Sequence, residues 1–425
     1  MEKGRHFPNW IKAILDNTVD VPSSPLFCKW AAISAIAGAL GRTAWFDGAG
    51  FEIGSNMLIV LVGGSTIGKS TSFELPYMKC FKELAVPSNS TKGKRNWHER
   101  WKKYGLNDPL RIAADRITSQ KMVVNLAQLG HVDMTLTSFA DSEPFYDSSA
   151  SLLVSEFGTF MKVYDEDTPK FLTEMWDRRP DYNHETKTGS NKEIYIRAPC
   201  LNAIFGATPG QFIDNLPKNV QNQGFLSRLL VVYDPRKFKE TGFPKPGWTP
   251  GLFKALREDL AEISKIKGAF DWEGGREGSF FKEVNEWIIE DFEPKPMHPR
   301  LLEYNGRRKA HFVKVAMSVS ASKRNDRLIT PEDWEETKGL MFEIEATMPI
   351  ALFGFGMSEI GKSSMDLLSE LRNSPKGMTI RDFNRKVMRT ARSVTEAQSL
   401  PKAMEDAGLI KIDGLLVRPG KNLTW

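Results

Sequence analysis

The stretch Met57–Thr71, MLIVLVGGSTIGKST, joins a short apolar run to a glycine-rich motif. The run from Met57 to Val62 is rich in β-branched residues, which favour a buried strand. Gly63, four further residues and Gly68-Lys69-Ser70 then match the phosphate-loop pattern G-x-x-x-x-G-K-S/T. Because a helix is expected behind it, up to Leu84, the motif has the strand–loop–helix context that such a match requires. The sequence therefore predicts a nucleotide-binding loop.

Each residue type in this loop has a chemical role. Glycines let backbone N–H groups face phosphate oxygens without an intervening Cβ. Lys69 can reach the β- and γ-phosphates, and the Ser70 hydroxyl can hold Mg²⁺. The helix that starts near Ser70 adds the positive end of its dipole. We therefore expect ATP and Mg²⁺ as cofactors, with the phosphates held by Gly63, Gly64, Ser65, Thr66, Ile67, Gly68, Lys69, Ser70 and Thr71.

The same pattern recurs at Gly356–Ser363, GMSEIGKS. About 60 residues follow it, which is too few for a second nucleotide-binding domain of typical size. No acidic strand end comes after it. We interpret this second match as a glycine-containing connector before a helix.

Composition limits the class of protein. The 425 residues suffice for about two or three domains. With 41% hydrophobic and 26% charged residues the chain is typical of soluble globular proteins, and its net charge of +5 is compatible with nucleic-acid binding. Three widely spaced cysteines show no metal or disulfide spacing, which favours a reducing compartment. Without a signal peptide or a membrane-spanning run, we expect a cytoplasmic protein that does not bind membranes.

A second apolar strand, within Ser151–Glu156 (SLLVSE), ends in an acidic residue. Glu156 is suited to orient or deprotonate the attacking water and to face the metal ion. Phosphate-loop ATPases often have an Asp before this Glu, which binds Mg²⁺ through water. Here the residue is Ser155, whose hydroxyl is a weaker partner. The alternative is an acidic residue that simply closes a strand.

The apolar segment Leu201–Phe205 predicts a third buried strand, which is followed by Gly206, Ala207 and Thr208. A polar residue at such a strand end can contact the γ-phosphate or the water, so Thr208 is a candidate sensor of the γ-phosphate. The alternative is a turn residue ahead of Pro209.

Two segments between these strands are candidate nucleic-acid contacts. Asp181–Glu193 is polar with a turn at Gly189 and leads to a strand at Ile194–Arg197, which predicts a β-hairpin with Lys187 near its tip. Ser88–Asp108 interleaves basic residues with Trp97, Trp101 and Tyr104, a composition that can follow a nucleic-acid backbone and stack bases. The favoured alternative for the second segment is an amphipathic helix whose tryptophans pack on the domain.

Breaks in composition divide the chain into four expected regions. These are a helical N-terminal segment (1–50), the nucleotide-binding core (51–240), a helical region resembling a lid (241–360) and a C-terminal domain (361–425). In the last, three helices and a hairpin around Asp413-Gly414 predict a winged helix. Basic residues that include Arg385 and Arg389 gather at its second helix and are candidate DNA contacts, with a protein–protein module as the alternative.

Together, these motifs resemble a family of phage- and plasmid-type ATPases, catalogued as a domain of unknown function, often found beside primase-polymerase domains and related to replicative hexameric helicases. The matching segments are WAAISAIAGALGR, GGSTIGKST, LLVSE, IFGATP and GFLSRLLVVYD, within residues 27–350. Their order is also similar to AAA+ helicases of the minichromosome-maintenance type. The resemblance implies an α/β fold, a P-loop NTPase (RecA/AAA+-like) with a three-layer αβα core, a helical lid and a winged helix.

The resemblance also implies roles for individual residues. ATP would lie between the subunits of a hexameric ring. Arg228, just before a buried strand, would act as an arginine finger on the neighbouring subunit's nucleotide, the alternative being a surface Arg that caps a helix. Arg308 of the lid would touch the γ-phosphate. Lys187 and Lys192 would hold single-stranded DNA in the central channel.

The expected function is therefore an ATP-dependent DNA helicase or translocase of phage or mobile-element replication, with a replication initiator or primase as partner. One alternative is a helicase loader or nucleoprotein-remodelling ATPase that does not unwind DNA. Another is a DNA-binding regulator that uses ATP only to assemble.

Overall fold

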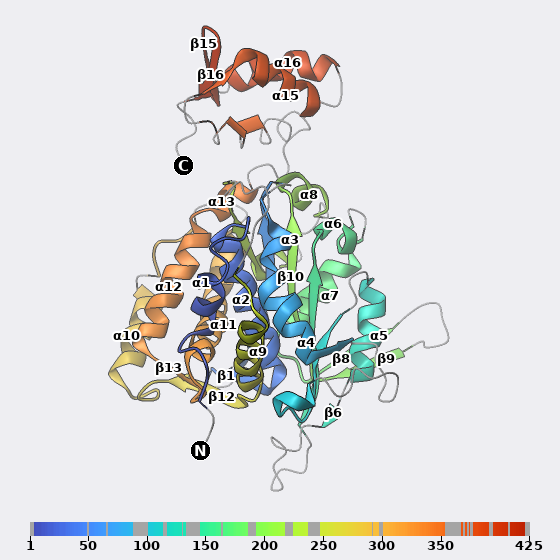
Figure 1. Cartoon of the computed structure of the whole chain (residues 1–425), viewed down its shortest axis with the longest axis vertical. Coiled ribbons are helices and arrows are strands. Elements are labelled where there is room, and N and C mark those ends of the chain that lie inside the picture. Colours follow the sequence, from blue (N-terminus) through green and yellow to red (C-terminus); the bar gives the residue numbers. More distant parts are fainter. Residues whose placement is uncertain are drawn as a thin grey trace.

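The structure of the protein is a computed structural model (Figure 1). The described ranges are 4–48, 51–64, 67–87, 101–113, 117–129, 131–132, 145–162, 165–185, 193–216, 224–236, 247–290, 292–296, 301–352, 367–368, 370–371, 374, 377–390, 394–406 and 409–420. The second phosphate-loop match, Gly356–Ser363, lies outside them.

A parallel sheet forms the centre of the molecule, with strand order β11–β3–β10–β7–β5–β4. The pairing is parallel throughout this path, and the short β6 adds antiparallel to β7. The strands in this order are β11 (Leu229–Tyr233), β3 (Leu58–Val62), β10 (Pro199–Ala207), β7 (Tyr146–Val154), β5 (Leu110–Ile112), β4 (Ala85–Pro87) and, off the path, β6 (His131–Val132).

The three apolar segments predicted as buried strands are β3, β7 and β10. All residues of β3 and β10 are buried, as expected for strands covered on both faces. The pairs Ala207↔Val62, Tyr233↔Val62 and Phe205↔Val154 bring the carboxyl ends of β3, β7, β10 and β11 to one edge of the sheet. In open α/β sheets ligands bind at this edge.

Helix α2 (Pro25–Leu40) is buried along nearly its whole length and packs against β3, β10 and β11. Its small residues permit this approach, since a Cβ on Gly38 would lie 2.2 Å from Ser151 Oγ. Helices α5 (Ser119–Leu129) and α7 (Asp167–Trp176) pack against β7 and β10, while α6 (Phe157–Phe160) and α8 (Pro209–Asp214) follow the ends of these strands. The sheet is therefore flanked by helices (Figure 1).

A second sheet joins the N-terminal segment to the region expected as a lid. Its strand order is β13–β12–β1–β2, formed by Leu328–Ile329, Gly268–Trp272, Ala44–Asp47 and Glu52–Gly54. Besides α2, the described helices of these two regions are α1 (Trp10–Asp16), α9 (Pro250–Ser264), α10 (Ser279–Glu290), α11 (Leu302–Lys323), α12 (Pro331–Glu345) and α13 (Met348–Leu352).

One hydrophobic core extends from Trp10 to Leu352. The expected boundaries at residues 50 and 240 therefore do not separate domains, because β1 pairs with both β2 and β12 across them. The helices expected as a separate lid are part of the same folded body as the central sheet.

Arg308 lies in this body as the cation of a buried ion pair. Its Nε and Nη2 donate to the two carboxylate oxygens of Glu345 at 2.8 and 2.6 Å, and Nη1 donates to the carbonyl of Phe292. The guanidinium also stacks on the rings of Phe292 and Phe312. Because Arg308 has no exposed surface, the expectation that it touches the γ-phosphate is wrong for this arrangement: its role is to neutralise Glu345.

We expect Arg308→Met to lower the free energy of unfolding by about 3–5 kcal/mol, because it leaves the Glu345 carboxylate buried without its partner. Urea denaturation of the full chain measures this change. The double variant Arg308→Met/Glu345→Gln removes the orphaned charge and should recover part of the loss. A single variant as stable as the wild type would contradict this role.

The C-terminal residues form a separate hydrophobic core that includes Leu371, Phe383, Val387 and Val417. Helices α15 (Ile380–Thr390) and α16 (Val394–Asp406) accompany a sheet of order β14–β16–β15, formed by Met378–Thr379, Leu416–Pro419 and Ile410–Asp413. The predicted hairpin around Asp413-Gly414 is confirmed, with Gly414 at a φ of 59°.

Candidate functional site

The phosphate loop begins where β3 ends. Gly63 N donates to the carbonyl of Ala207 at 3.0 Å, which fixes the start of the loop to the end of β10. A Cβ on Gly63 would lie 2.0 Å from Ile67 Cδ1, so the loop folds tightly over this position. Gly64 is exposed, whereas Ser65 and Thr66 lie outside the described residues.

Gly68 forms the N-cap of α3 (Lys69–Ser72) with a φ of 74°, a conformation that glycine adopts readily. A Cβ here would lie 2.0 Å from the carbonyl oxygen of Pro22. Beyond α3 the helix continues through a π-helical segment, Glu74–Phe81, into α4 (Lys82–Leu84). This segment contains Pro76, which has no N–H for the regular helical pattern. The predicted helix behind the loop is thus confirmed.

The side chain of Lys69 folds back over the loop. Its Nζ donates to the carbonyls of Gly63 and Gly64 at 2.7 and 2.6 Å. Burial lowers the pKa of Lys69 from 10.5 to about 8. A phosphate anion at this point would favour the charged ammonium, so anion binding and protonation of Lys69 support each other. Ser70 follows at the exposed surface.

Gly206, near the end of β10, lies next to both Lys69 and Ser155, the residue before Glu156. A Cβ on Gly206 would lie 2.5 Å from the carbonyl oxygen of Ser155 and 3.7 Å from Lys69 Cβ. Ser155 and Glu156 are both exposed, and Glu156 is the N-cap residue of α6. The structure thus brings the phosphate loop and Glu156 to the same edge, one strand apart.

Thr208 stands between them, directly after β10. Its hydroxyl oxygen accepts a hydrogen bond from Gln211 N at 3.2 Å, and Thr208 N donates to Gln211 Oε1 at 3.4 Å. This capping box starts α8 at Pro209. Thr208 therefore has the turn role that the sequence allowed as an alternative. Its side chain also lies at the same edge of the sheet as Glu156.

Arg228 lies at the other end of the sheet. It immediately precedes β11, whose first residue pairs with Leu58 and whose last pairs with Val62 beside the loop. Five residues of strand place Arg228 about 16 Å from the loop. Its guanidinium is buried and bonded to Asp177 Oδ2 at 2.9 Å and to the carbonyl of Gly224. It therefore neither reaches its own chain's loop nor caps a helix at the surface.

The predicted hairpin is confirmed as β8 (Asp181–Glu185) paired with β9 (Glu193–Arg197). Lys187 and Lys192 lie outside the described residues. Alternate positions of the described stem form an exposed face, on which Tyr195 donates to Asp181 at 2.8 Å. The other side chains of this face include Asn183, Glu193 and Arg197. Carboxylates outnumber cations on this face, so the described part of the hairpin is poorly suited to bind the phosphates of a nucleic-acid backbone.

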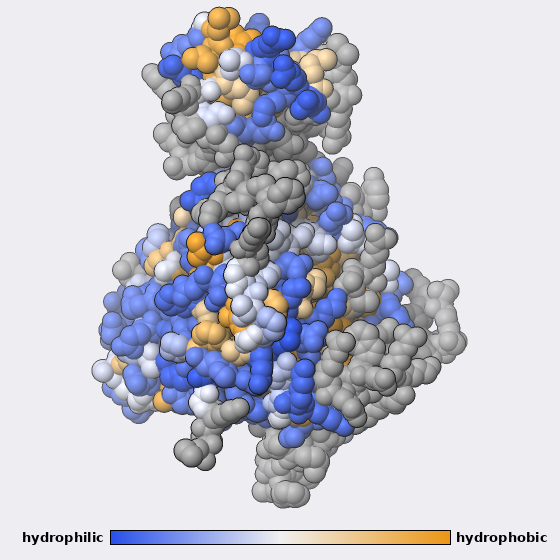
Figure 2. Space-filling model, viewed as in Figure 1, coloured by the Kyte–Doolittle hydropathy of each residue, from blue (hydrophilic) through white to orange (hydrophobic). Residues whose placement is uncertain are grey.

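Arg385 and Arg389 are both exposed on α15. Arg385 forms an ion pair with Asp382 at 3.3 Å, and the neighbouring Lys386 forms one with Glu370. Exposed apolar side chains, Met388 and Leu415, lie on the same unit. Figure 2 shows hydrophobic groups at the end of this unit where the β15–β16 hairpin lies. Both open interpretations, DNA contact and protein contact, thus retain suitable side chains.

Of the basic-aromatic segment, residues 101–108 are described. Trp101 and Tyr104 are buried, whereas Lys102 and Lys103 are exposed and lie over these two rings. For this part the packing interpretation is confirmed.

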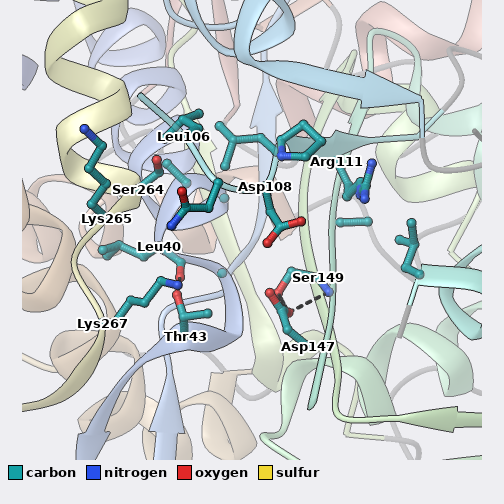
Figure 3. Close-up of a pocket in the computed structure, with 18 of the residues that line it drawn as sticks. Leu40, Thr43, Leu106, Asp108, Arg111, Asp147, Ser149, Ser264, Lys265 and Lys267 are labelled. Carbon is teal, nitrogen blue, oxygen red and sulfur yellow. Dashed lines mark hydrogen bonds between the residues drawn. The ribbon is translucent and has the colours of Figure 1, made fainter. Parts of the chain in front are cut away.

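A cavity of about 600 Å³ opens at the amino end of the central strands, away from the phosphate loop (Figure 3). Its charged lining includes Asp108, Arg111, Asp147, Lys265 and Lys267. The last turns of α2 and α9 also reach it, and the carbonyl ends of helices favour cations. Arg327 also lines it, so four cations face two carboxylates there. None of the described lining residues belongs to the phosphate loop, so this cavity is separate from the loop.

The ion pair between Asp234 and Arg236, which lies beside the phosphate loop, was not predicted from the sequence. It directly follows β11, in the sequence VVYDPR, and the rule that singled out Thr208, a polar residue after a buried strand, would have found it. Within the described residues no cluster of His, Cys, Asp and Glu could hold a metal ion, and no helix has the length and apolar character needed to cross a bilayer.

No protein-family model matches the chain, and no curated protein matches its sequence. The family resemblance of the motifs therefore stays a prediction.

We expect Gly206→Ala to reduce ATP turnover at least about tenfold and to destabilise the fold by about 1–3 kcal/mol, since its methyl group would displace the Ser155 backbone. Steady-state ATPase assays and thermal unfolding measure both effects. Gly210→Ala is the matched control, because a Cβ there meets no atom within 4 Å. Equal activity of the two variants would show that this contact does not constrain the site.

Proposed function

We propose that the chain is an ATP-hydrolysing DNA helicase or translocase that works as a hexameric ring in the replication of a phage or other mobile element. The observation that carries this proposal is the close approach at Gly206, where the missing Cβ leaves room for the Ser155 carbonyl on the side next to Lys69. It holds the strand end that bears Glu156 near the phosphate loop. A loop alone would bind a nucleotide. A carboxylate held one strand away can also act on water at the γ-phosphate.

In this mechanism the loop N–H groups and Lys69 bind the phosphates, with Lys69 exchanging the carbonyls of Gly63 and Gly64 for phosphate oxygens. Ser70 offers its exposed hydroxyl to the metal ion, and Glu156 orients the water and accepts its proton. Thr208 senses the γ-phosphate from the end of β10. A bound Mg²⁺ would neutralise charge on the β- and γ-phosphates.

A ring is proposed because Arg228 lies at the opposite end of the sheet from the loop. In a head-to-tail assembly one subunit can present that end to the next subunit's loop. Arg228 would then exchange Asp177 for the neighbour's phosphate. Arg307 lies 4.0 Å from the same carboxylate, and both guanidinium groups lie over the Trp176 ring, so positive charge is already concentrated there.

Mixing Arg228→Ala subunits with Lys69→Ala subunits tests the trans role. Each variant alone should lose ATPase activity. An equal mixture should recover roughly a quarter of the wild-type rate, because about one interface in four then combines an intact loop with an intact arginine. Arg228→Lys, which keeps the charge beside Asp177, controls for misfolding. Absence of recovery at every mixing ratio would count against trans action.

The rival function is a helicase loader or nucleoprotein-remodelling ATPase without unwinding activity. Two observations favour it: the carboxylates on the exposed face of the hairpin stem and the exposed Met388 and Leu415 of the C-terminal unit. Both features suit a protein partner, such as a replication initiator or primase, better than a DNA strand. DNA contact by the hairpin would then depend on Lys187 and Lys192.

A strand-displacement assay separates these functions. We expect the wild type to unwind a forked DNA duplex and both Lys69→Ala and Glu156→Gln to lose ATP turnover by at least about a hundredfold. Glu156→Gln should still bind ATP, since the loop is intact. DNA-stimulated hydrolysis without unwinding would favour the loader. Negligible turnover by the wild type, with persistent DNA binding, would favour a regulator that uses ATP only to assemble.

A further inference from the structure

The carboxyl end of β11 places a cationic side chain beside the phosphate loop. Tyr233 pairs with Val62, and Asp234 N donates to the carbonyl of Val62 at 3.1 Å. A Cβ on Gly63 would lie 2.9 Å from the carbonyl oxygen of Asp234. The segment that leads to Arg236 therefore touches the first glycine of the loop.

Asp234 holds Arg236 through three hydrogen bonds. Backbone N and side-chain Nε of Arg236 donate to Oδ1, both at 3.0 Å, and Nη2 donates to Oδ2 at 3.2 Å. Ser24, the N-cap of α2, donates to the same Oδ2 at 2.6 Å. The Asp234 side chain is 1% exposed, whereas that of Arg236 is 66% exposed. A buried, fixed carboxylate thus orients a guanidinium that is open to solvent.

The strand order indicates which part of a nucleotide Arg236 would meet. Glu156 and Thr208 follow β7 and β10, which lie on one side of β3, whereas β11 lies on the other. If the γ-phosphate points toward Glu156, about two strand spacings or 10 Å from β3, the sugar and base extend in the opposite direction. That direction leads to Asp234 and Arg236.

We propose that Arg236 binds the sugar–base half of the nucleotide by stacking its guanidinium plane on the base. This inference rests on the proposed ATP site and adds a recognition residue to it. A guanidinium stacks well on aromatic rings because it is planar and weakly hydrated. Asp234 occupies one edge of the guanidinium and leaves its faces available.

Isothermal titration of ATP and of inorganic tripolyphosphate tests this contact. The protein is the full chain carrying Glu156→Gln, which prevents turnover. We expect Arg236→Ala to weaken ATP binding about tenfold and to leave tripolyphosphate binding unchanged. Arg236→Lys keeps the charge but loses the plane, so it should also weaken ATP binding selectively. Arg276→Ala is the matched control, an arginine paired with Asp47 in the second sheet.

The outcomes separate this inference from the proposed function. Unchanged ATP affinity in Arg236→Ala, relative to Arg276→Ala, would overturn the inference alone. Equal losses with both probes would overturn it too, because a phosphate contact or a merely structural role predicts that result. If the parent protein binds neither probe, the ATP site itself is wrong and the inference fails with it.

Discussion

The close approach of backbone segments at three glycines is the constraint on which the site depends. Because Gly63, Gly68 and Gly206 lack a Cβ, the carbonyl groups of Asp234, Pro22 and Ser155 can approach them closely. A Cβ added to these glycines would lie 2.9, 2.0 and 2.5 Å, respectively, from the three carbonyl oxygens. The loop is thus enclosed by the N-terminal segment and by the ends of the β7 and β11 strands. Gly63 and Gly68, at the two ends of the loop, are therefore held in place by packed backbone, which limits the freedom that these two positions can lose on binding a ligand.

The opposite edge of the sheet has a different electrostatic character. Lys314 is fully buried beneath Arg228 and Trp176, and its Nζ donates to the oxygens of Gly54, Asn56 and Trp176 rather than to a carboxylate. Burial lowers the pKa of Lys314 to about 7, and it lowers the pKa of His311 to about 3, so that this imidazole is neutral at physiological pH. Asp177 lies 2.9 Å from Arg228 and 4.0 Å from Arg307, so one carboxylate faces two guanidinium groups at this edge.

Local patterns predicted the parts of this arrangement that depend on neighbouring residues. The phosphate loop, its strand and helix, and the hairpin stem all follow from short-range spacing. Contacts between distant residues could not be read in this way. Nothing near Arg308 in the chain indicates that its carboxylate partner is Glu345, and nothing near residue 50 indicates that β1 pairs with β12. Composition therefore suggested domain boundaries where the fold has none.

The pairing of β1 with β12 also determines when the protein can fold. Trp10 bonds to the carbonyl of Leu256, and Arg5 bonds to the carbonyl of Ala321, 316 residues further along. During synthesis α1 cannot complete its packing until α9 and α11 have left the ribosome. Such long-range contacts slow folding and leave apolar surface open meanwhile. The body that carries the phosphate loop can therefore reach its final packing only after α11 has been synthesised.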